Sequence, residues 1–142
     1  MPGKIVNAFY GFLDIRNFTD LTEVLQADVV TVVNSIAHLV HTAVTDNYGS
    51  PNKNIGDAFL VVWKPNRGKK VEEVADAALQ SFIRIIVETS RSKELQRISM
   101  RREVQERMPK HQIKMGFGLH HGWAIECAIG SHEKIDATYL SP

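Results

Sequence analysis

Two aspartates are the residues of this sequence whose types and positions best suit metal-dependent chemistry. Asp14 ends an apolar run that begins at Ile5, and Asp57 follows a glycine between two segments of strand-like composition. If adjacent strands of one sheet carry them, the two carboxylates repel each other, and a divalent cation removes that cost. Hard oxygen ligands suit magnesium or manganese, which support phosphoryl chemistry. The structural alternative stays open: Asp14 caps the next helix and Asp57 makes a turn.

Other polar or glycine-rich patterns carry weaker signals. Lys53 precedes the Gly-Asp pair and, taken alone, indicates an exposed and solvated side chain. The glycines between Gly116 and Gly122 do not open a helix after a strand, so they favour close packing over dinucleotide binding. His38 and His41 have helical spacing but no further ligand nearby, which favours a structural role over a zinc site.

Composition excludes several classes of protein. The 142 residues fit one domain, and a formal net charge of +1 argues against nucleic acid as a partner. A single cysteine rules out an intrachain disulfide and the paired cysteines of a structural zinc site. No apolar run approaches the ~20 residues of a membrane-spanning helix, and the N-terminus does not have the pattern of a signal peptide.

The first half of the chain predicts a strand, two helices and a hairpin. A strand is expected over residues 5–13, followed by a helix that starts near Asp20 with Glu23 completing a capping box. Apolar residues at helical spacing predict a second helix after Asp28, its N-cap, ending in the Gly- and Pro-containing stretch 47–51. The segments 52–55 and 58–63 then predict a β-hairpin that turns at Gly56-Asp57.

The second half predicts one helix and further strands. Residues 71–86 have helical spacing, and the polar stretch 88–110 is expected to extend this helix before a loop near Pro109. Residues 113–119 and 123–129 predict two strands joined at His120-His121-Gly122, and residues 135–140 predict the start of another. This order favours an α+β fold with helices on one face of a mostly antiparallel sheet.

Four motifs in this order resemble those of the class III adenylyl and guanylyl cyclase catalytic domains. The matching segments are Phe12–Thr19, Lys53–Leu60, the pair Gly116–Gly122 and Ala128–Ser131, and Asp136–Leu140. The resemblance spans residues 5–140. It implies that residues 1–142 form a single partial catalytic domain with the ferredoxin-like nucleotidyl cyclase fold, incomplete at the C-terminus.

The resemblance also implies metal and phosphate roles. Asp14 and Asp57 would be the catalytic residues and would hold two Mg²⁺ or Mn²⁺ ions, with the backbone carbonyl of Ile15 assisting one ion. Phe18 and Thr19, at the end of the first motif, would belong to the substrate site. Asn17 stands where relatives commonly have glycine, as does Cys127.

The purine contacts implied by the resemblance are Lys53 and Thr138. In this family a lysine at the first position accompanies ATP, whereas a glutamate accompanies GTP. The chemistry agrees, because a lysine ammonium only donates hydrogen bonds and N1 of adenine only accepts them. Thr138 matches the threonine-bearing subgroup of adenylyl cyclases, which includes bicarbonate-responsive enzymes.

The implied function is conversion of ATP to 3′,5′-cyclic AMP and pyrophosphate in a head-to-tail dimer, formed with a second copy or another cyclase domain. One subunit would supply the aspartates and the other the purine contacts, and the expected location is the cytoplasm, with a parent protein that could be membrane-anchored. The family motif continues with Asn, Arg and Lys beyond Pro142, so we expect this chain alone to make little cyclic AMP.

The sequence leaves two alternatives to an active cyclase. A catalytically silent, cyclase-like regulatory or nucleotide-binding module is the main one, although such a module would be free to lose Asp14, Asp57 and Lys53. A diguanylate cyclase is disfavoured, because the Gly-Gly-acidic signature of its hairpin is absent.

Overall fold

Alternation of side chains along the first strand divides the sheet into two faces. Phe9, Leu13 and Ile15 are buried in the main hydrophobic core, whereas Tyr10 belongs to a small apolar cluster on the opposite side. This period of two is the geometry of a pleated strand. Asp14 shares the parity of Tyr10, so it lies on the face away from the core.

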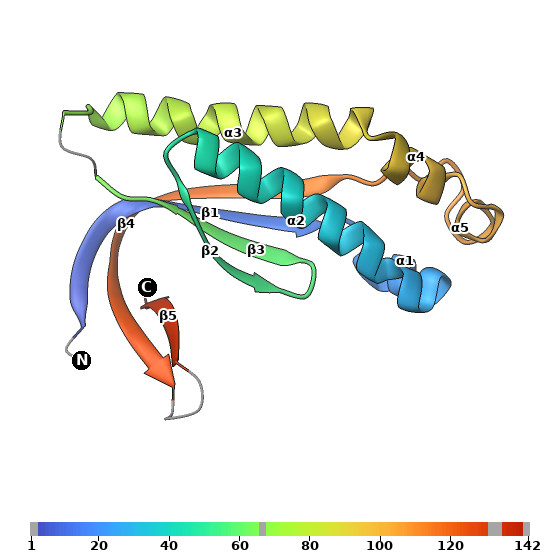
Figure 1. Cartoon of the computed structure of the whole chain (residues 1–142), viewed down its shortest axis with the longest axis horizontal. Helices are drawn as coiled ribbons and strands as arrows, with labels where there is room; N and C mark the ends of the chain where they lie inside the picture. The colour runs from blue at the N-terminus through green and yellow to red at the C-terminus, as the bar shows by residue number, and fades with distance from the viewer. Residues whose placement is uncertain (1–2, 66–67, 131–134, 141–142) are drawn as a thin grey trace.

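The computed structural model describes residues 3–65, 68–130 and 135–140. Helices lie on one side of a twisted sheet, and the other side is open (Figure 1). The elements are β1 (Lys4–Ile15), α1 (Phe18–Leu25), a 3₁₀ turn (Gln26–Asp28), α2 (Val29–Asp46), β2 (Ser50–Ile55), β3 (Ala58–Trp63), α3 (Val71–Arg91), α4 (Lys93–Ser99), α5 (Arg102–Arg107), β4 (Met115–Gly130) and β5 (Ile135–Leu140).

The strands are ordered β2-β3-β1-β4-β5, and each neighbouring pair is antiparallel. The central strand β1 pairs with β4 along its whole length, from Lys4 to Ile15, and with β3 from Phe9 to Asp14. The predicted α+β architecture, with helices on one face of an antiparallel sheet, is therefore confirmed.

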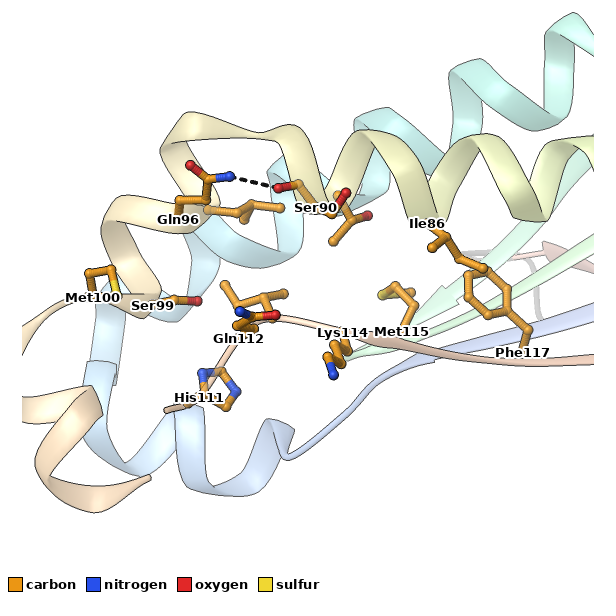
Figure 2. A pocket seen from close by; sticks show the side chains of 13 residues that line it. Ile86, Ser90, Gln96, Ser99, Met100, His111, Gln112, Lys114, Met115 and Phe117 are labelled. Carbon is orange, nitrogen blue, oxygen red and sulfur yellow. Dashed lines mark hydrogen bonds between the residues drawn. The ribbon is translucent and has the colours of Figure 1, made fainter. Parts of the chain in front are cut away.

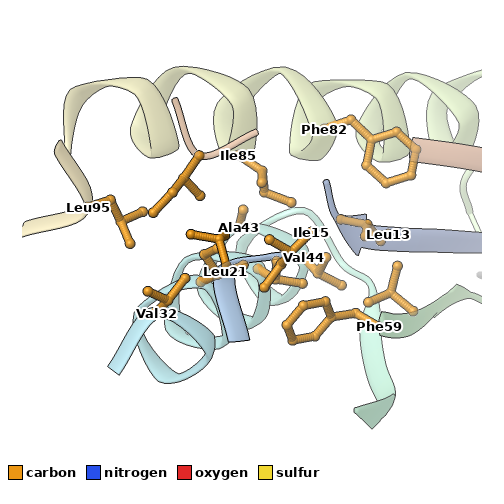
Figure 3. Close-up of a cluster of buried hydrophobic side chains, with 14 of the residues drawn as sticks. Leu13, Ile15, Leu21, Val32, Ala43, Val44, Phe59, Phe82, Ile85 and Leu95 are labelled. Atoms are coloured by element: carbon orange, nitrogen blue, oxygen red, sulfur yellow. The ribbon is translucent and has the colours of Figure 1, made fainter. Parts of the chain in front are cut away.

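The main core lies between the helices and the sheet. Figure 3 shows side chains from β1 and β3 meeting side chains from α1, α2, α3 and α4. Burial of such apolar surface is the principal favourable term in folding. The most completely buried large residues include Leu13, Leu21, Val32, Ile36, Phe59, Trp63, Ile85 and Leu95.

The prediction of two strands joined at His120-His121-Gly122 was wrong, because β4 is one continuous strand of 16 residues. His121 pairs with Phe9 in the β1 register, and the two rings stack with centroids 4.2 Å apart. A local turn signal is overridden here, because β1 offers an unbroken partner and a glycine is tolerated within a strand.

The predicted capping box of α1 was wrong, whereas Asp28 is the N-cap residue of α2 as predicted, although its side chain makes no capping hydrogen bond. No side chain caps α1, and its N-cap residue, Asn17, adopts a left-handed conformation with φ of 57°. Asp20 and Glu23 instead accept hydrogen bonds from the Arg107 guanidinium of α5, and Asp28 accepts one of 2.9 Å from Arg101. These charge-assisted bonds tie the first helices to a distant segment.

The stretch 88–110 forms three helical pieces instead of one extension. The helix α3 ends at Arg91, and the hydroxyl of Ser92 accepts a 3.3 Å hydrogen bond from the Leu95 amide to cap α4. Leu95 and Val104 are buried in the main core. The break therefore lets α4 and α5 bury apolar side chains that a straight helix would carry past the end of the sheet.

Among the described residues, Phe18–Asp46 is long and apolar enough to cross a membrane by length and composition alone, which the sequence analysis did not anticipate. In the structure this stretch is divided into α1, the 3₁₀ turn and α2. Val32, Ile36 and Val40 are fully buried against the rest of the core. The stretch therefore forms amphipathic helices of the fold. Core helices can be as long and as apolar as membrane-spanning ones.

Candidate active site

The end of β1 and the β2–β3 turn meet at one corner of the sheet. Asp14 lies between Ala58 of β3 and Gly116 of β4 in the strand register. Asp57 directly precedes Ala58, and its backbone carbonyl accepts a 3.1 Å hydrogen bond from the Ile15 amide. The fold thus brings Asp14, Ile15 and Asp57 to the same corner, as the strand placement predicted.

A cleft of about 420 Å³ opens on the helix-free face beside this corner. Asp14 and Lys53 both line it, although 39 residues separate them in the sequence. Phe12, which shares the face of Asp14, is 53% exposed. The full lining is Phe12, Leu13, Asp14, Arg16, Lys53, Ile55, Ala58, Phe59, Leu60, Gly116, Phe117 and Gly118.

Asp14 has an oxygen with unused bonding capacity. Its Oδ1 atom is buried and has no hydrogen-bond partner in the part of the chain that the structure describes. The Arg16 Nε atom is 3.6 Å away, which makes an ion pair but not a hydrogen bond. Asp14 does not cap α1 either. The alternative role for Asp14, as a helix cap, therefore lacks the hydrogen bond that a cap would make. The carboxylate keeps lone pairs that could bind a cation.

Glycine at position 116 makes room for this arrangement. A Cβ atom there would lie 2.2 Å from the Arg16 Nη2 atom, so any larger residue would displace the guanidinium. The glycine therefore lets Arg16 lie across β4 as the counter-charge of Asp14. The sequence predicted close packing at this glycine, which agrees with the structure. It did not indicate a role for Arg16.

The remaining predicted substrate residues lie elsewhere. Phe18 is half-buried and packs against the main core, and Thr19 is exposed in the first turn of α1. Thr138 lies on β5 opposite Cys127, eleven residues further along β4 than Gly116. At ~3.3 Å per residue that is roughly 35 Å along the strand. A single chain therefore does not bring Thr138 to its own Asp14.

A polar cluster holds β5 to the rest of the open face. The Tyr139 hydroxyl donates a 3.0 Å hydrogen bond to the Glu126 carboxylate, which also pairs with the Lys64 ammonium at 2.5 Å. The neighbouring ammonium keeps the pKa of Glu126 below its ordinary value. Burial raises the pKa of Tyr139. The strand that carries Thr138 is thus fixed by charge-assisted bonds.

Comparison with known proteins identifies the family. The sequence profile of the adenylate and guanylate cyclase catalytic domain matches residues 6–137. This chain belongs to that family. The terminal-differentiation-specific adenylate cyclase of Dictyostelium discoideum is 29% identical over 130 residues, which make up 91% of this chain and 6% of that protein.

Solved cyclase structures share the fold. A bacterial light-regulated adenylyl cyclase is 29% identical with a TM-score of 0.75, and the match covers 100% of this chain and 38% of that one. The guanylyl cyclase Cya2 is 20% identical with a TM-score of 0.73, covering 99% of this chain and 66% of that one. The chain is therefore a cyclase catalytic domain sequence with both adenylyl and guanylyl enzymes among its neighbours. It spans well under half the length of the first two relatives.

The oxygen ligands at the corner formed by Asp14, Ile15 and Asp57 fit a hard divalent cation. Within residues 3–65, 68–130 and 135–140, no group of three or more His, Cys, Asp or Glu side chains could hold a metal. Two carboxylates and a backbone carbonyl are too few for a self-contained site, so substrate oxygens and water would complete the coordination, as is usual for magnesium.

His41 contacts the Asn54 Oδ1 atom at 3.2 Å, which supports a structural role for that histidine.

Proposed function

We propose that this chain provides the catalytic site of an adenylate cyclase, which converts ATP to 3′,5′-cyclic AMP and pyrophosphate. The observation that carries the proposal is the open-face cleft, which Asp14 lines beside the Asp57 turn. A cleft of about 420 Å³ is in the size range of small-molecule sites. Membership of the cyclase family supplies the reaction type.

Asp14 and Asp57 would hold two Mg²⁺ or Mn²⁺ ions, with the Ile15 carbonyl as a further ligand. The buried Oδ1 atom of Asp14, which has no hydrogen-bond partner among the described residues, supports this assignment. When bound, such ions lower the pKa of the ribose 3′-hydroxyl and neutralise charge on the triphosphate. Arg16, paired with Asp14 and 61% exposed, keeps the net charge of the corner from becoming strongly negative.

The reaction makes one phosphorus–oxygen bond and breaks another. The ribose 3′-oxygen attacks the α-phosphorus, the bond from that phosphorus to the bridging oxygen of the β-phosphate breaks, and pyrophosphate leaves with the electron pair. The hydroxyl proton passes to solvent. Asp14 and Asp57 would contribute to this step by holding the cations that bind the triphosphate, which would orient the attacking oxygen and the leaving group.

Lys53 and Thr138 would select adenine within a dimer. The distance along β4 between Thr138 and the Asp14 corner supports a site shared by two cyclase domains, either two copies of this chain or one copy and another cyclase domain. The exposed Phe12 on the open face supports a partner on that side. Lys53 favours ATP over GTP, because its ammonium donates to N1 of adenine and repels the protonated N1 of guanine. A cytoplasmic location is part of this proposal.

Calorimetric titration of manganese-ATP into the chain tests the metal assignment. We expect Asp57→Ala to weaken binding by about tenfold or more, which corresponds to losing roughly 1.4 kcal/mol of interaction. Asp76→Ala, at an exposed position of α3, is the matched control and should leave the affinity unchanged. Equal affinity for the Asp57→Ala variant and the parent chain would exclude a metal role for that carboxylate.

Turnover distinguishes the enzyme from the silent alternative. A cyclic AMP assay on the protein that contains this chain should detect product with manganese-ATP, and Asp14→Ala should abolish it. Tight manganese-ATP binding without any product would instead assign the chain to a nucleotide-sensing cyclase-like module.

A further inference from the structure

A second cavity lies on the helix-covered side, where the end of α3, the helix α4 and the start of β4 come together (Figure 2). Its volume is about 540 Å³. Phe117 lines both this cavity and the open-face cleft, and otherwise the two have different linings. The lining of the second cavity is Ile86, Thr89, Ser90, Leu95, Gln96, Ser99, Met100, His111, Gln112, Ile113, Lys114, Met115 and Phe117.

Two buried polar side chains line this cavity without partners. His111 is 8% exposed, and neither of its ring nitrogens has a hydrogen-bond partner among the described residues. Thr89 is 5% exposed, and its hydroxyl is likewise unpartnered within those residues. Buried polar groups are almost always satisfied in native proteins, so three such atoms at one cavity need an explanation.

The chain satisfies comparable groups elsewhere. The buried Ser81 hydroxyl donates to the carbonyl oxygens of Ala77 and Ala43. At the cavity itself, the Gln96 amide donates a 2.7 Å hydrogen bond to the Ser90 carbonyl, as Figure 2 shows. The Gln105 amide donates to the backbone carbonyls of Ser99 and His111. The Gln96 and Gln105 amides are thus engaged with the backbone, whereas the His111 ring and the Thr89 hydroxyl have no partner among the described residues.

The chemistry of the lining specifies the class of ligand. Apolar side chains dominate the walls, among them Ile86, Leu95, Met115 and Phe117. No carboxylate is part of the lining, and the cationic residue that is, Lys114, is exposed. A charged molecule would therefore lose hydration without gaining a buried counter-charge.

The His111 imidazole determines which polar group a ligand of this cavity would carry. Burial lowers the pKa of His111, so the ring is neutral near pH 7 and offers one donor and one acceptor. A hydroxyl group on a ligand, itself a donor and an acceptor, matches this pair and the Thr89 hydroxyl. We propose that this cavity binds a small, uncharged and largely apolar molecule whose hydroxyl group bonds to His111 and Thr89.

Two probes that differ by one hydroxyl group test the proposal. Protein-observed NMR titration of the chain with 2-naphthol, against naphthalene, should show saturable shifts around the cavity and about tenfold tighter binding of 2-naphthol, the ratio expected for ~1.4 kcal/mol of hydrogen bonding. The readout does not involve nucleotide, so it stands apart from the proposed cyclase function.

Variants locate the hydroxyl contact. Thr89→Val keeps the shape of the side chain and His111→Phe keeps a ring, and we expect each to reduce the preference for 2-naphthol to a few-fold at most. Thr31→Val, at an exposed position of α2, should leave it unchanged. Circular dichroism confirms that each variant is folded, and either variant alone suffices if the other unfolds. Failure of both probes to saturate, or equal preference in the parent chain and a folded variant, would overturn the proposal.

Discussion

The two faces of the sheet use neighbouring residues of the same strands for opposite purposes. On the covered face, Leu13 of β1 and Phe59 of β3 are each 2% exposed and pack beneath the helices. On the open face, Phe12 is 53% exposed, and Asp14 has a buried oxygen without a hydrogen bond. Near the end of β1 stability and chemistry are therefore separated by parity, whereas Tyr10, further back on the open face, is buried in the smaller apolar cluster. The covered face holds the fold, which leaves the open face free to carry exposed apolar and poorly satisfied groups.

Truncating one residue on each face measures this separation most directly. Leu13→Ala should lower the free energy of unfolding by about 2–5 kcal/mol, because it leaves a cavity in the core. Phe12→Ala should change it by less than about 1 kcal/mol, as is usual for exposed positions. Urea unfolding of the two variants and the parent chain, with a common slope, gives both values. Similar losses for the two variants would show that the open face is also part of the folding core.

The second prediction concerns selectivity on the open face. Replacing Lys53 by Glu together with Thr138 by Cys should lower the ratio of cyclic AMP to cyclic GMP by about tenfold or more, because an acceptor now faces N1 of the purine. The measurement is product analysis of the cyclase protein that contains this chain, supplied with equal ATP and GTP. Lys93→Glu, on the exposed start of α4, controls for the change in charge. Retained activity with an unchanged ratio would remove Lys53 from the purine site.

The smallest expected effect compares a covered histidine with an open-face one. Burial lowers the pKa of His111 below its ordinary value of 6.5. The unfolded chain therefore takes up the proton first, and stability should fall as the pH drops below 6.5, with no contribution from this residue above it. Thermal melts on both sides of that pH should show a loss that His111→Phe removes. His120→Phe, at an exposed position, should keep it. An equal loss in both variants would assign the effect to other groups.

Local patterns predicted the elements that are stabilised locally. The apolar spacing of α2 and the Gly56-Asp57 turn were read correctly, because helix periodicity and turn chemistry are written in neighbouring residues. The capping box at the start of α1 was misread, since Arg107, the partner of Asp20, lies 87 positions away. The continuity of β4 was missed for the same reason, because it depends on pairing with β1.

The candidate site was predictable only in part. Asp14 and Asp57 were predicted to lie close together because each ends or joins a strand in a recognisable motif, and the structure places them at one corner. Phe12 could have been found from its i, i+2 relation to Asp14, which puts both on one face. No pattern in the sequence links Thr89 with His111, which line one cavity only because α3 packs near the segment before β4.

The unbroken course of β4 has a consequence for how this sequence can change over time. The strand fixes the spacing between Gly116, at the aspartate corner, and Cys127, opposite Thr138. Deleting one residue between them would turn every later side chain to the other face, and the ion pair between Glu126 and Lys64 would be lost. Deleting two would keep the faces but move the Thr138 position by about 7 Å relative to the corner. The length of this segment is therefore constrained, and we expect substitutions in it to be tolerated far more readily than insertions or deletions.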